Sequence, residues 1–157
     1  MYRLLCCNKR KYTNKIPTDI NPKDIKTFIP NISEGRVIKC YDGDTITLAA
    51  YPYKESELYK FSVRLNGIDC PEIRSKIHSE KQCALLAKAT IESKILNKMI
   101  ILKNVKTEKY GRLLADIYLK DEPTTSIALW MIEQKLAVKY DGKKKISPEN
   151  WMKYYSS

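Results

Sequence analysis

The stretch RVIKCYDGDTITLAAY, residues 36–51, contains the strongest indication of the fold. Both of its halves are rich in β-branched and apolar residues, and Asp42-Gly43 lies between them. Aspartate and glycine tolerate the backbone conformations of a tight turn, so the stretch predicts a β-hairpin with strands over residues 36–40 and 45–51. A hairpin at this point begins an antiparallel sheet.

The chain after the hairpin combines further strands with helices. Residues 58–68 alternate apolar and polar side chains, which predicts a third strand. Further elements are expected in this order: a helix over 79–97 opened by a capping box at Ser79-Glu80-Lys81-Gln82, strands over 99–105 and 112–119, a helix from Thr125 and a short last helix from Ser147-Pro148. This order predicts an α+β fold, a five-stranded OB-fold β-barrel with three helices.

The composition indicates a folded, strongly basic chain. Its 157 residues suffice for one domain with its own core, and 29 Lys and Arg against 18 Asp and Glu give a net charge of +11. Clustered positive charge attracts polyanions and speeds their encounter with the protein. Nucleic acid is therefore a candidate partner, although a generally lysine-rich proteome would produce the same excess.

Cysteine and histidine usage narrows the chemistry. Five cysteines form no C-x-x-C pair and are odd in number, which disfavours a disulfide framework or a structural zinc site. We therefore expect an intracellular, reducing compartment, the cytoplasm. The single histidine, His78, excludes a nuclease mechanism that needs two imidazoles.

The N-terminal region differs from the rest of the chain. We expect residues 1–34 to form a basic, flexible tail and linker, and residues 35–157 to form the domain. Cys6 and Cys7 precede a basic cluster, a pattern that also fits acylation with a polybasic membrane contact. Tyr2 follows the initiator methionine, which excludes myristoylation. The acylated anchor and the plain basic tail both remain open.

Two acidic turns supply oxygen ligands. Asp44 would meet Asp69 if the second strand begins beside the end of the third. Two carboxylates, a backbone carbonyl such as that of Cys70, and water are enough to hold Ca²⁺. The sequence therefore predicts a calcium site between these turns.

Three further side chains fit phosphodiester chemistry. Glu72 follows Asp69 on a proline-stiffened turn, where its carboxylate could orient or deprotonate an attacking water. Arg64 and Arg112 could each bind two phosphate oxygens and stabilise charge that builds on phosphorus. In a straight third strand, Arg64 and Asp69 would face opposite sides, so their joint action requires an irregularity at Asn66-Gly67.

The runs 37–45 (VIKCYDGDT), 63–72 (VRLNGIDCPE) and 108–115 (EKYGRLLA) together resemble the staphylococcal nuclease (thermonuclease) family. The resemblance covers roughly residues 35–155 and rests on three motifs in the family's order. It implies the same barrel with three helices and a Ca²⁺-dependent endonuclease that acts on DNA and RNA and leaves 3′-phosphate ends. By motif, the catalytic residues would be Arg64, Glu72 and Arg112, and the metal ligands Asp44, Asp69 and the Cys70 carbonyl.

The same resemblance assigns substrate contacts. Lys109 and Tyr110 match positions that bind a terminal phosphate, Tyr140 matches a pocket aromatic, and Asp42 would support the metal site from behind.

A narrow barrel groove favours binding of single-stranded nucleic acid. We also expect the protein to be a monomer. The alternative is a catalytically inactive module of the same fold that binds nucleic acid or protein. The presence of all five catalytic and ligand side chains favours the enzyme.

Overall fold

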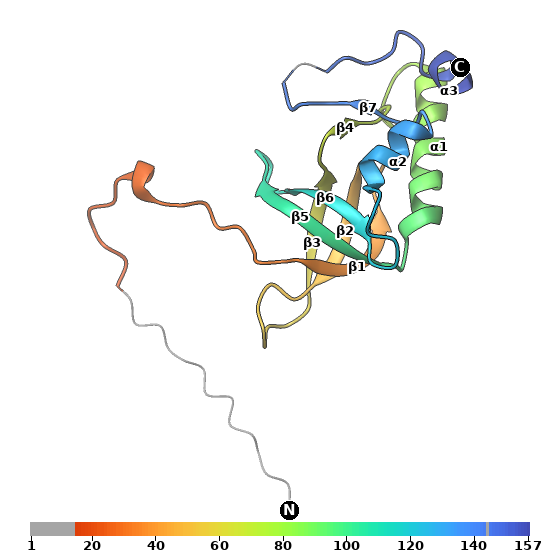
Figure 1. The fold of residues 1–157 in the computed structure, drawn as a ribbon. Coiled ribbons are helices and arrows are strands. Elements are labelled where there is room, and N and C mark those ends of the chain that lie inside the picture. Colours follow the sequence, from red (N-terminus) through yellow and green to blue (C-terminus); the bar gives the residue numbers. More distant parts are fainter. Residues whose placement is uncertain (1–14, 144) are drawn as a thin grey trace, which may run out of the picture.

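The fold is a closed five-stranded barrel accompanied by helices. A computed structural model describes residues 15–143 and 145–157 of the chain (Figure 1). The barrel strands are β1 (Glu34–Cys40), β2 (Thr45–Ala50), β3 (Tyr59–Leu65), β5 (Met99–Thr107) and β6 (Leu113–Leu119). Their order around the barrel is β1-β2-β3-β6-β5, with a parallel β3–β6 pair and antiparallel pairs elsewhere. The predicted α+β barrel of the OB type is confirmed.

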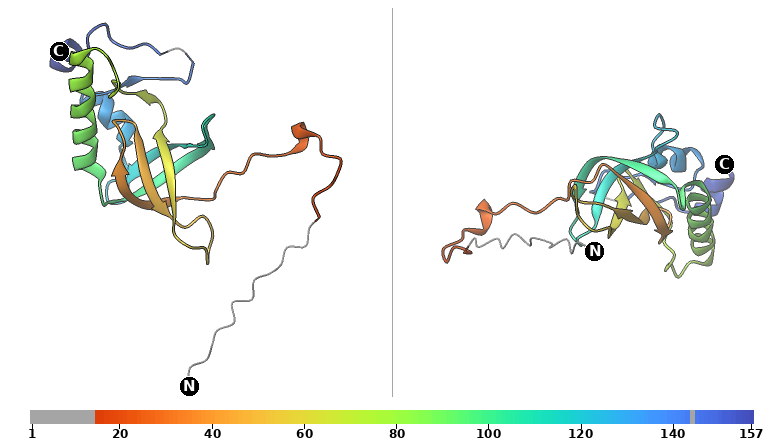
Figure 2. Two further views of the ribbon diagram at one scale, coloured as in Figure 1. Left: turned by 180° about the vertical axis from the view of Figure 1, so that it is seen from behind. Right: turned by 90° about the horizontal axis from the view of Figure 1, so that it is seen from below.

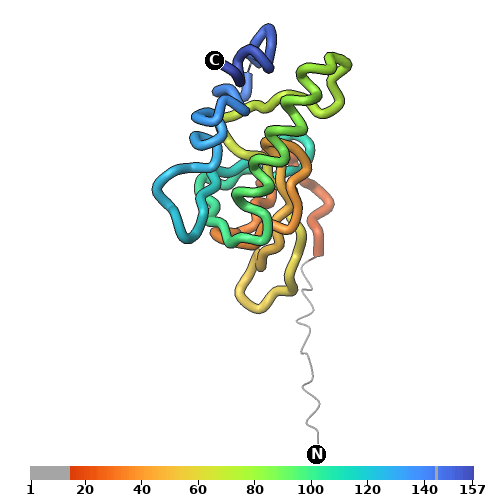
Figure 3. Tube along the Cα trace, turned by 90° about the vertical axis from the view of Figure 1, so that its right-hand side faces the viewer, coloured from red at the N-terminus to blue at the C-terminus, as the bar shows by residue number. Residues whose placement is uncertain are grey.

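Three α-helices lie in the described part of the chain: α1 (His78–Ile95), α2 (Ile127–Glu133) and α3 (Trp151–Ser156). Figure 3 shows α1 running across the barrel, with α2 and α3 towards one end of it. The first half of α1 contacts α3, where the Cys83 and Met152 sulfur atoms are 3.1 Å apart. Helix α1 also contacts β1 and α2 contacts β6, so both helices pack against the barrel.

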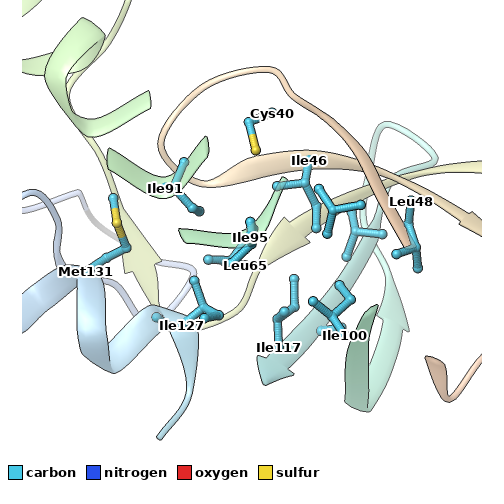
Figure 4. Close-up of a cluster of buried hydrophobic side chains, with 14 of the residues drawn as sticks. Cys40, Ile46, Leu48, Leu65, Ile91, Ile95, Ile100, Ile117, Ile127 and Met131 are labelled. Carbon is cyan, nitrogen blue, oxygen red and sulfur yellow. The ribbon is translucent and has the colours of Figure 1, made fainter. Parts of the chain in front are cut away.

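The hydrophobic core fills the barrel and continues to α1 and α2 (Figure 4). In β6 every second side chain is buried, which is the period-two pattern of a strand with one face inward. Ile91 and Ile95 of α1 join this core one helical turn apart. Burial of one such side chain stabilises the fold by roughly 2–3 kcal/mol. The core thereby fixes the strand ends that carry the polar residues of interest.

The strand predicted over residues 58–68 is interrupted. β3 ends at Leu65, Asn66 and Gly67 form a turn in which Gly67 has φ +84°, and a short strand β4 (Ile68–Asp69) follows. β4 pairs with β7 (Val138–Lys139), a strand that the sequence analysis missed. Glycine adopts this backbone conformation at little cost, and the turn redirects the chain out of the barrel.

The helix starts differ from those predicted. Ile77 is the N-cap of α1, without a side-chain cap, and Ser79 lies inside the helix, so the capping box at Ser79 is wrong. α3 begins at Trp151, with Asn150 rather than Ser147 as its N-cap. Asn150 accepts a hydrogen bond from the Lys153 amide at 3.0 Å, which satisfies a backbone donor of the first turn.

The described N-terminal segment projects away from the barrel. Residues 15–29 are exposed and extend to one side in Figures 1 and 2, whereas Ile32 joins the core just before β1. The boundary at residues 34 and 35 remains a prediction. Cys6 and Cys7 lie outside the described residues. No helix in the described ranges combines the length and apolarity needed to cross a bilayer.

Candidate active site

The two acidic turns meet at the side chain of Arg64. β2 begins beside the end of β3, because Thr45 pairs with Arg64 and the Leu65 amide donates to the Asp44 carbonyl at 2.8 Å. Arg64 Nη1 lies 2.7 Å from Asp44 Oδ1, and Arg64 Nη2 lies 3.1 Å from Asp69 Oδ1. Asp44 and Asp69 are both buried. One guanidinium thus bridges two buried carboxylates from different turns.

The interruption of the third strand makes this bridge possible. In a straight strand, residues 64 and 69 would point to opposite faces. The Asn66-Gly67 turn folds Asp69 back, and Arg64 Nη2 also donates to the Ile68 carbonyl at 3.3 Å. Pairing of β4 with β7 then holds the backbone of Asp69 opposite Val138. The required irregularity is therefore a turn and a new strand pair.

Gly43 lets the two acidic turns approach closely. A Cβ at this position would lie 2.8 Å from Cys70 Sγ and 3.0 Å from Ala87 Cβ, so at least the cysteine would have to shift. The Asp44 amide donates to Asp42 Oδ1 at 3.1 Å, so Asp42 orders the turn from behind. The DGD run is thus shaped both by the absence of a side chain and by a local carboxylate.

Glu72 lies on a turn fixed by a carboxylate from α1. Glu80 Oε1 accepts the Glu72 amide at 3.2 Å, and Glu80 Oε2 accepts the Ser75 hydroxyl at 2.6 Å. Glu80, to which the sequence analysis gave no separate role, thus holds the acidic turn. The Glu72 side chain itself is 64% exposed, so its carboxylate faces solvent beside the buried acids.

Arg112 is held by a residue that the sequence analysis quoted within a motif but gave no role. Glu108 Oε2 accepts from Arg112 Nε at 2.8 Å and also lies 2.8 Å from Arg112 Nη2. Glu108 Oε1 lies 3.7 Å from Arg64 Nε, so this carboxylate stands between both arginines. An acid four residues before an arginine in a short loop was the available signal. Its connection to Arg64 is a tertiary contact that no spacing reveals.

The charges of this cluster support one another. Burial raises the pKa of the Asp44 carboxyl to about 6, against the opposing effect of Arg64. Burial alone would lower the pKa of Arg64, but Asp44 and Asp69 outweigh it and raise that pKa. The guanidinium therefore stays charged, and its charge compensates the buried acids.

Asp44 and Asp69 are the candidate side-chain ligands for a hard cation. Asp69 Oδ2 is buried, and Lys145 Nζ forms an ion pair with it at 2.8 Å. Within residues 15–143 and 145–157, no three His, Cys, Asp or Glu side chains gather as a metal site. An ion between Asp44 and Asp69 would therefore take further oxygens from the backbone, as at Cys70, and from water.

The three residues predicted to contact nucleic acid, Lys109, Tyr110 and Tyr140, lie in loops next to the barrel. Lys109 and Tyr110 occupy the loop between β5 and β6, where Tyr110 is 83% exposed. Tyr140 follows β7 and donates its amide to the Gly67 carbonyl at 2.9 Å. It lines an apolar cleft of about 600 Å³ that also includes Ile68, Leu129 and Ile146. The structure thus joins Tyr140 to the turn beside Arg64 and leaves Tyr110 facing solvent.

Comparison with known proteins gives a consistent result. The family described as "Staphylococcal nuclease homologue" matches residues 62–155, which include Arg64, Asp69, Glu72 and Arg112. A protein named probable endonuclease from Schizosaccharomyces pombe is 34% identical over 101 residues, covering 60% of this chain and 44% of that protein. Another, from Candida glabrata, is 36% identical over 96 residues, covering 60% of this chain and 37% of that protein. The chain thus spans less than half the length of either relative.

Proposed function

The chain belongs to the staphylococcal nuclease family, and from this premise we propose that it is a calcium-dependent endonuclease that hydrolyses DNA and RNA. The observation that carries the proposal is the bridge from Arg64 to Asp44 and Asp69, with Arg112 linked to it through Glu108. Basic groups that bind phosphate thereby stand beside oxygen ligands for a hard cation.

The proposed metal ligands are the side chains of Asp44 and Asp69 and the carbonyl of Cys70. A bound Ca²⁺ ion would supply positive charge beside the scissile phosphate. The burial of Asp69 Oδ2 supports this assignment, because a buried anionic oxygen gains from a cation nearby, as the Lys145 ammonium at 2.8 Å illustrates.

The side chains of Glu72, Arg64 and Arg112 would activate the water and stabilise the phosphate charge. Glu72 would orient and deprotonate the attacking water, since it is exposed enough to reach solvent and is fixed at its backbone by Glu80. Arg64 and Arg112 would place their positive charge beside the phosphate oxygens and stabilise the charge that develops at phosphorus. Glu108 would keep both guanidiniums aligned.

The proposed products are fragments that end in a 3′-phosphate, and the preferred substrates are single strands. Lys109 and Tyr110 would contact a terminal phosphate, while Tyr140 would contact a nucleotide at the cleft beside the Asn66-Gly67 turn. Single strands present bases and phosphates to such a rim better than a duplex does.

A catalytically inactive module of the same fold is the second candidate. It would retain the barrel and the basic surface but would need no water-activating carboxylate. The joint presence of Glu72, Arg64 and Arg112 with two buried acids favours the enzyme.

The test is hydrolysis of a fluorescent single-stranded oligonucleotide in Ca²⁺ and in EGTA, with the product ends identified. We expect cleavage in Ca²⁺ only, with 3′-phosphate ends. Glu72→Gln should reduce turnover by about 10²-fold or more while the thermal melting curve stays unchanged. An intact oligonucleotide that nevertheless binds folded protein in Ca²⁺ would support the inactive module instead.

We further propose that the protein acts as a monomer in a reducing intracellular compartment, the cytoplasm. Cys40, Cys70 and Cys83 are free and buried. Acylation at Cys6 and Cys7 would add a membrane contact. Size-exclusion chromatography tests the first proposal, and comparison of the membrane fraction of the wild type with a Cys6→Ser, Cys7→Ser variant tests the second.

A further inference from the structure

Lys145 joins two of the acids assigned above. Its Nζ lies 2.8 Å from Asp69 Oδ2 and 3.2 Å from Glu72 Oε1. The lysine comes from the segment between β7 and α3, more than seventy residues from either acid in sequence. The contact therefore depends on the tertiary fold.

The contact with Asp69 is a short ion pair. Asp69 Oδ2 is buried, and the ammonium lies 2.8 Å away from it. Asp69 Oδ1 is already bound by Arg64. The lysine therefore supplies charge to the one Asp69 oxygen that remains available, as a small cation would.

We propose that Lys145 is a tethered cation that a divalent ion must displace from Asp69 and Glu72, and that it thereby sets the Ca²⁺ concentration at which the site fills. Two cations cannot both approach one buried oxygen closely, because their repulsion is strong at such distances. This inference rests on the proposed calcium site and adds a residue that controls it.

The Lys145 side chain can move away from the two acids at low cost. Its side chain is 34% exposed, and the described residues around it in the segment 141–147 are exposed as well. A lysine stem is flexible, and its ammonium is readily hydrated, so withdrawal into solvent costs little. Withdrawal would also release Glu72, which the proposed mechanism requires to be free for water.

The test compares Lys145→Gln with Lys143→Gln by calorimetric titration with Ca²⁺ alone, at fixed ionic strength. Both changes remove one positive charge from the same segment. Of the two lysines, only Lys145 forms ion pairs with Asp69 and Glu72 in the part of the chain that the structure describes. Since a partly exposed ion pair contributes modestly, we expect Lys145→Gln to bind Ca²⁺ about fivefold more tightly than Lys143→Gln. Equal affinities in the two variants, or weaker binding in Lys145→Gln, would overturn the proposal.

A second measurement follows the segment itself. Limited trypsin digestion after Lys145 should become faster when Ca²⁺ is added to the wild type, because the ammonium loses its partners. Slower cleavage would contradict displacement. Calcium binding with the expected lysine effect but without nucleic-acid cleavage would leave this inference standing and remove the proposed activity. No calcium binding by any of the three proteins would remove both.

Discussion

Glu108 holds Arg112 through two contacts of 2.8 Å, from Nε and from Nη2 to the same carboxylate oxygen. The other oxygen of Glu108 faces Arg64 at 3.7 Å. The two arginines assigned to phosphate therefore share one acidic support. The carboxylate between them lowers the repulsion between the two guanidiniums.

Replacing Glu108 tests this support. Glu108→Gln keeps the size of the side chain but removes the anion, so its hydrogen bonds to Arg112 become weaker. We expect turnover on a single-stranded oligonucleotide to fall about tenfold, with little change in melting temperature. Glu133→Gln, an exposed change on α2, is the matched control. Equal turnover in both variants would show that Glu108 does not position the arginines.

Arg64→Lys tests whether the forked guanidinium is required. A lysine presents one point charge and cannot reach Asp44 and Asp69 with separate N–H groups, as Arg64 does at 2.7 and 3.1 Å. We expect turnover to fall by about 10²-fold or more and the protein to lose about 1–3 kcal/mol of stability, because a buried carboxylate is left uncompensated.

The control for this change is Arg74→Lys, whose guanidinium contacts the Tyr41 hydroxyl at an exposed position. Steady-state kinetics and urea unfolding would be measured on both variants. Similar values for the two would mean that charge alone, without bidentate geometry, suffices at residue 64.

Gly43→Ala should push the two acidic turns apart. The new Cβ would meet Cys70 Sγ at 2.8 Å, and overpacking of this kind costs roughly 1–3 kcal/mol. Urea unfolding should show that loss, and Ca²⁺ binding should weaken with it. Adding Cys70→Ala removes the nearest atom, so the double variant should recover part of the stability. No recovery would point to Ala87 as the obstacle instead.

The buried Cys40 thiol should make the free energy of unfolding depend on pH in the alkaline range. Burial, reinforced by Glu92, raises the pKa of its thiol from 9.0 to about 11. Between these values the unfolded chain releases the proton while the folded protein keeps it, so stability falls as pH rises from about 9 to about 11. The loss from this group is at most about 2–3 kcal/mol.

Urea unfolding of the wild type and of Cys40→Ala at pH 8, 9 and 10 isolates this contribution from those of tyrosine and lysine. The stability of Cys40→Ala should fall less steeply above pH 9. Parallel pH profiles for the two proteins would show that the thiol does not titrate differently on folding.

Removal of residues 1–29 should leave the fold and the proposed nuclease activity intact. The described residues 15–29 are exposed, whereas Pro30 and Ile32 are buried next to the barrel. Melting temperature and oligonucleotide turnover would be compared with those of the full chain. A truncated protein that melts at a much lower temperature would place the domain boundary earlier than residue 35.

The barrel and its helices were predictable because their signals are local. Alternating burial in β6 and helical spacing in α1 reflect which faces pack inward, and the DG turn marks the hairpin. The start of α1 was not predictable, because Ile77 caps it without a side-chain bond and Ser79 lies inside the helix. The carboxylate of Glu80 bonds to the Glu72 turn instead. Several partners compete for one side chain, and only the folded chain selects among them.

In the candidate site, too, some features could be predicted from the sequence and others could not. Residue types and motif order along the chain were enough to select Asp44, Asp69, Glu72, Arg64 and Arg112 as candidates, since the chemistry proposed for them limits which side chains serve. The strand pair β4–β7, the bridging role of Glu108 and the contact of Lys145 with two acids were decided by tertiary structure alone. Two-residue strands carry no periodic pattern, and contacts between distant segments depend on where packing of the whole core brings them.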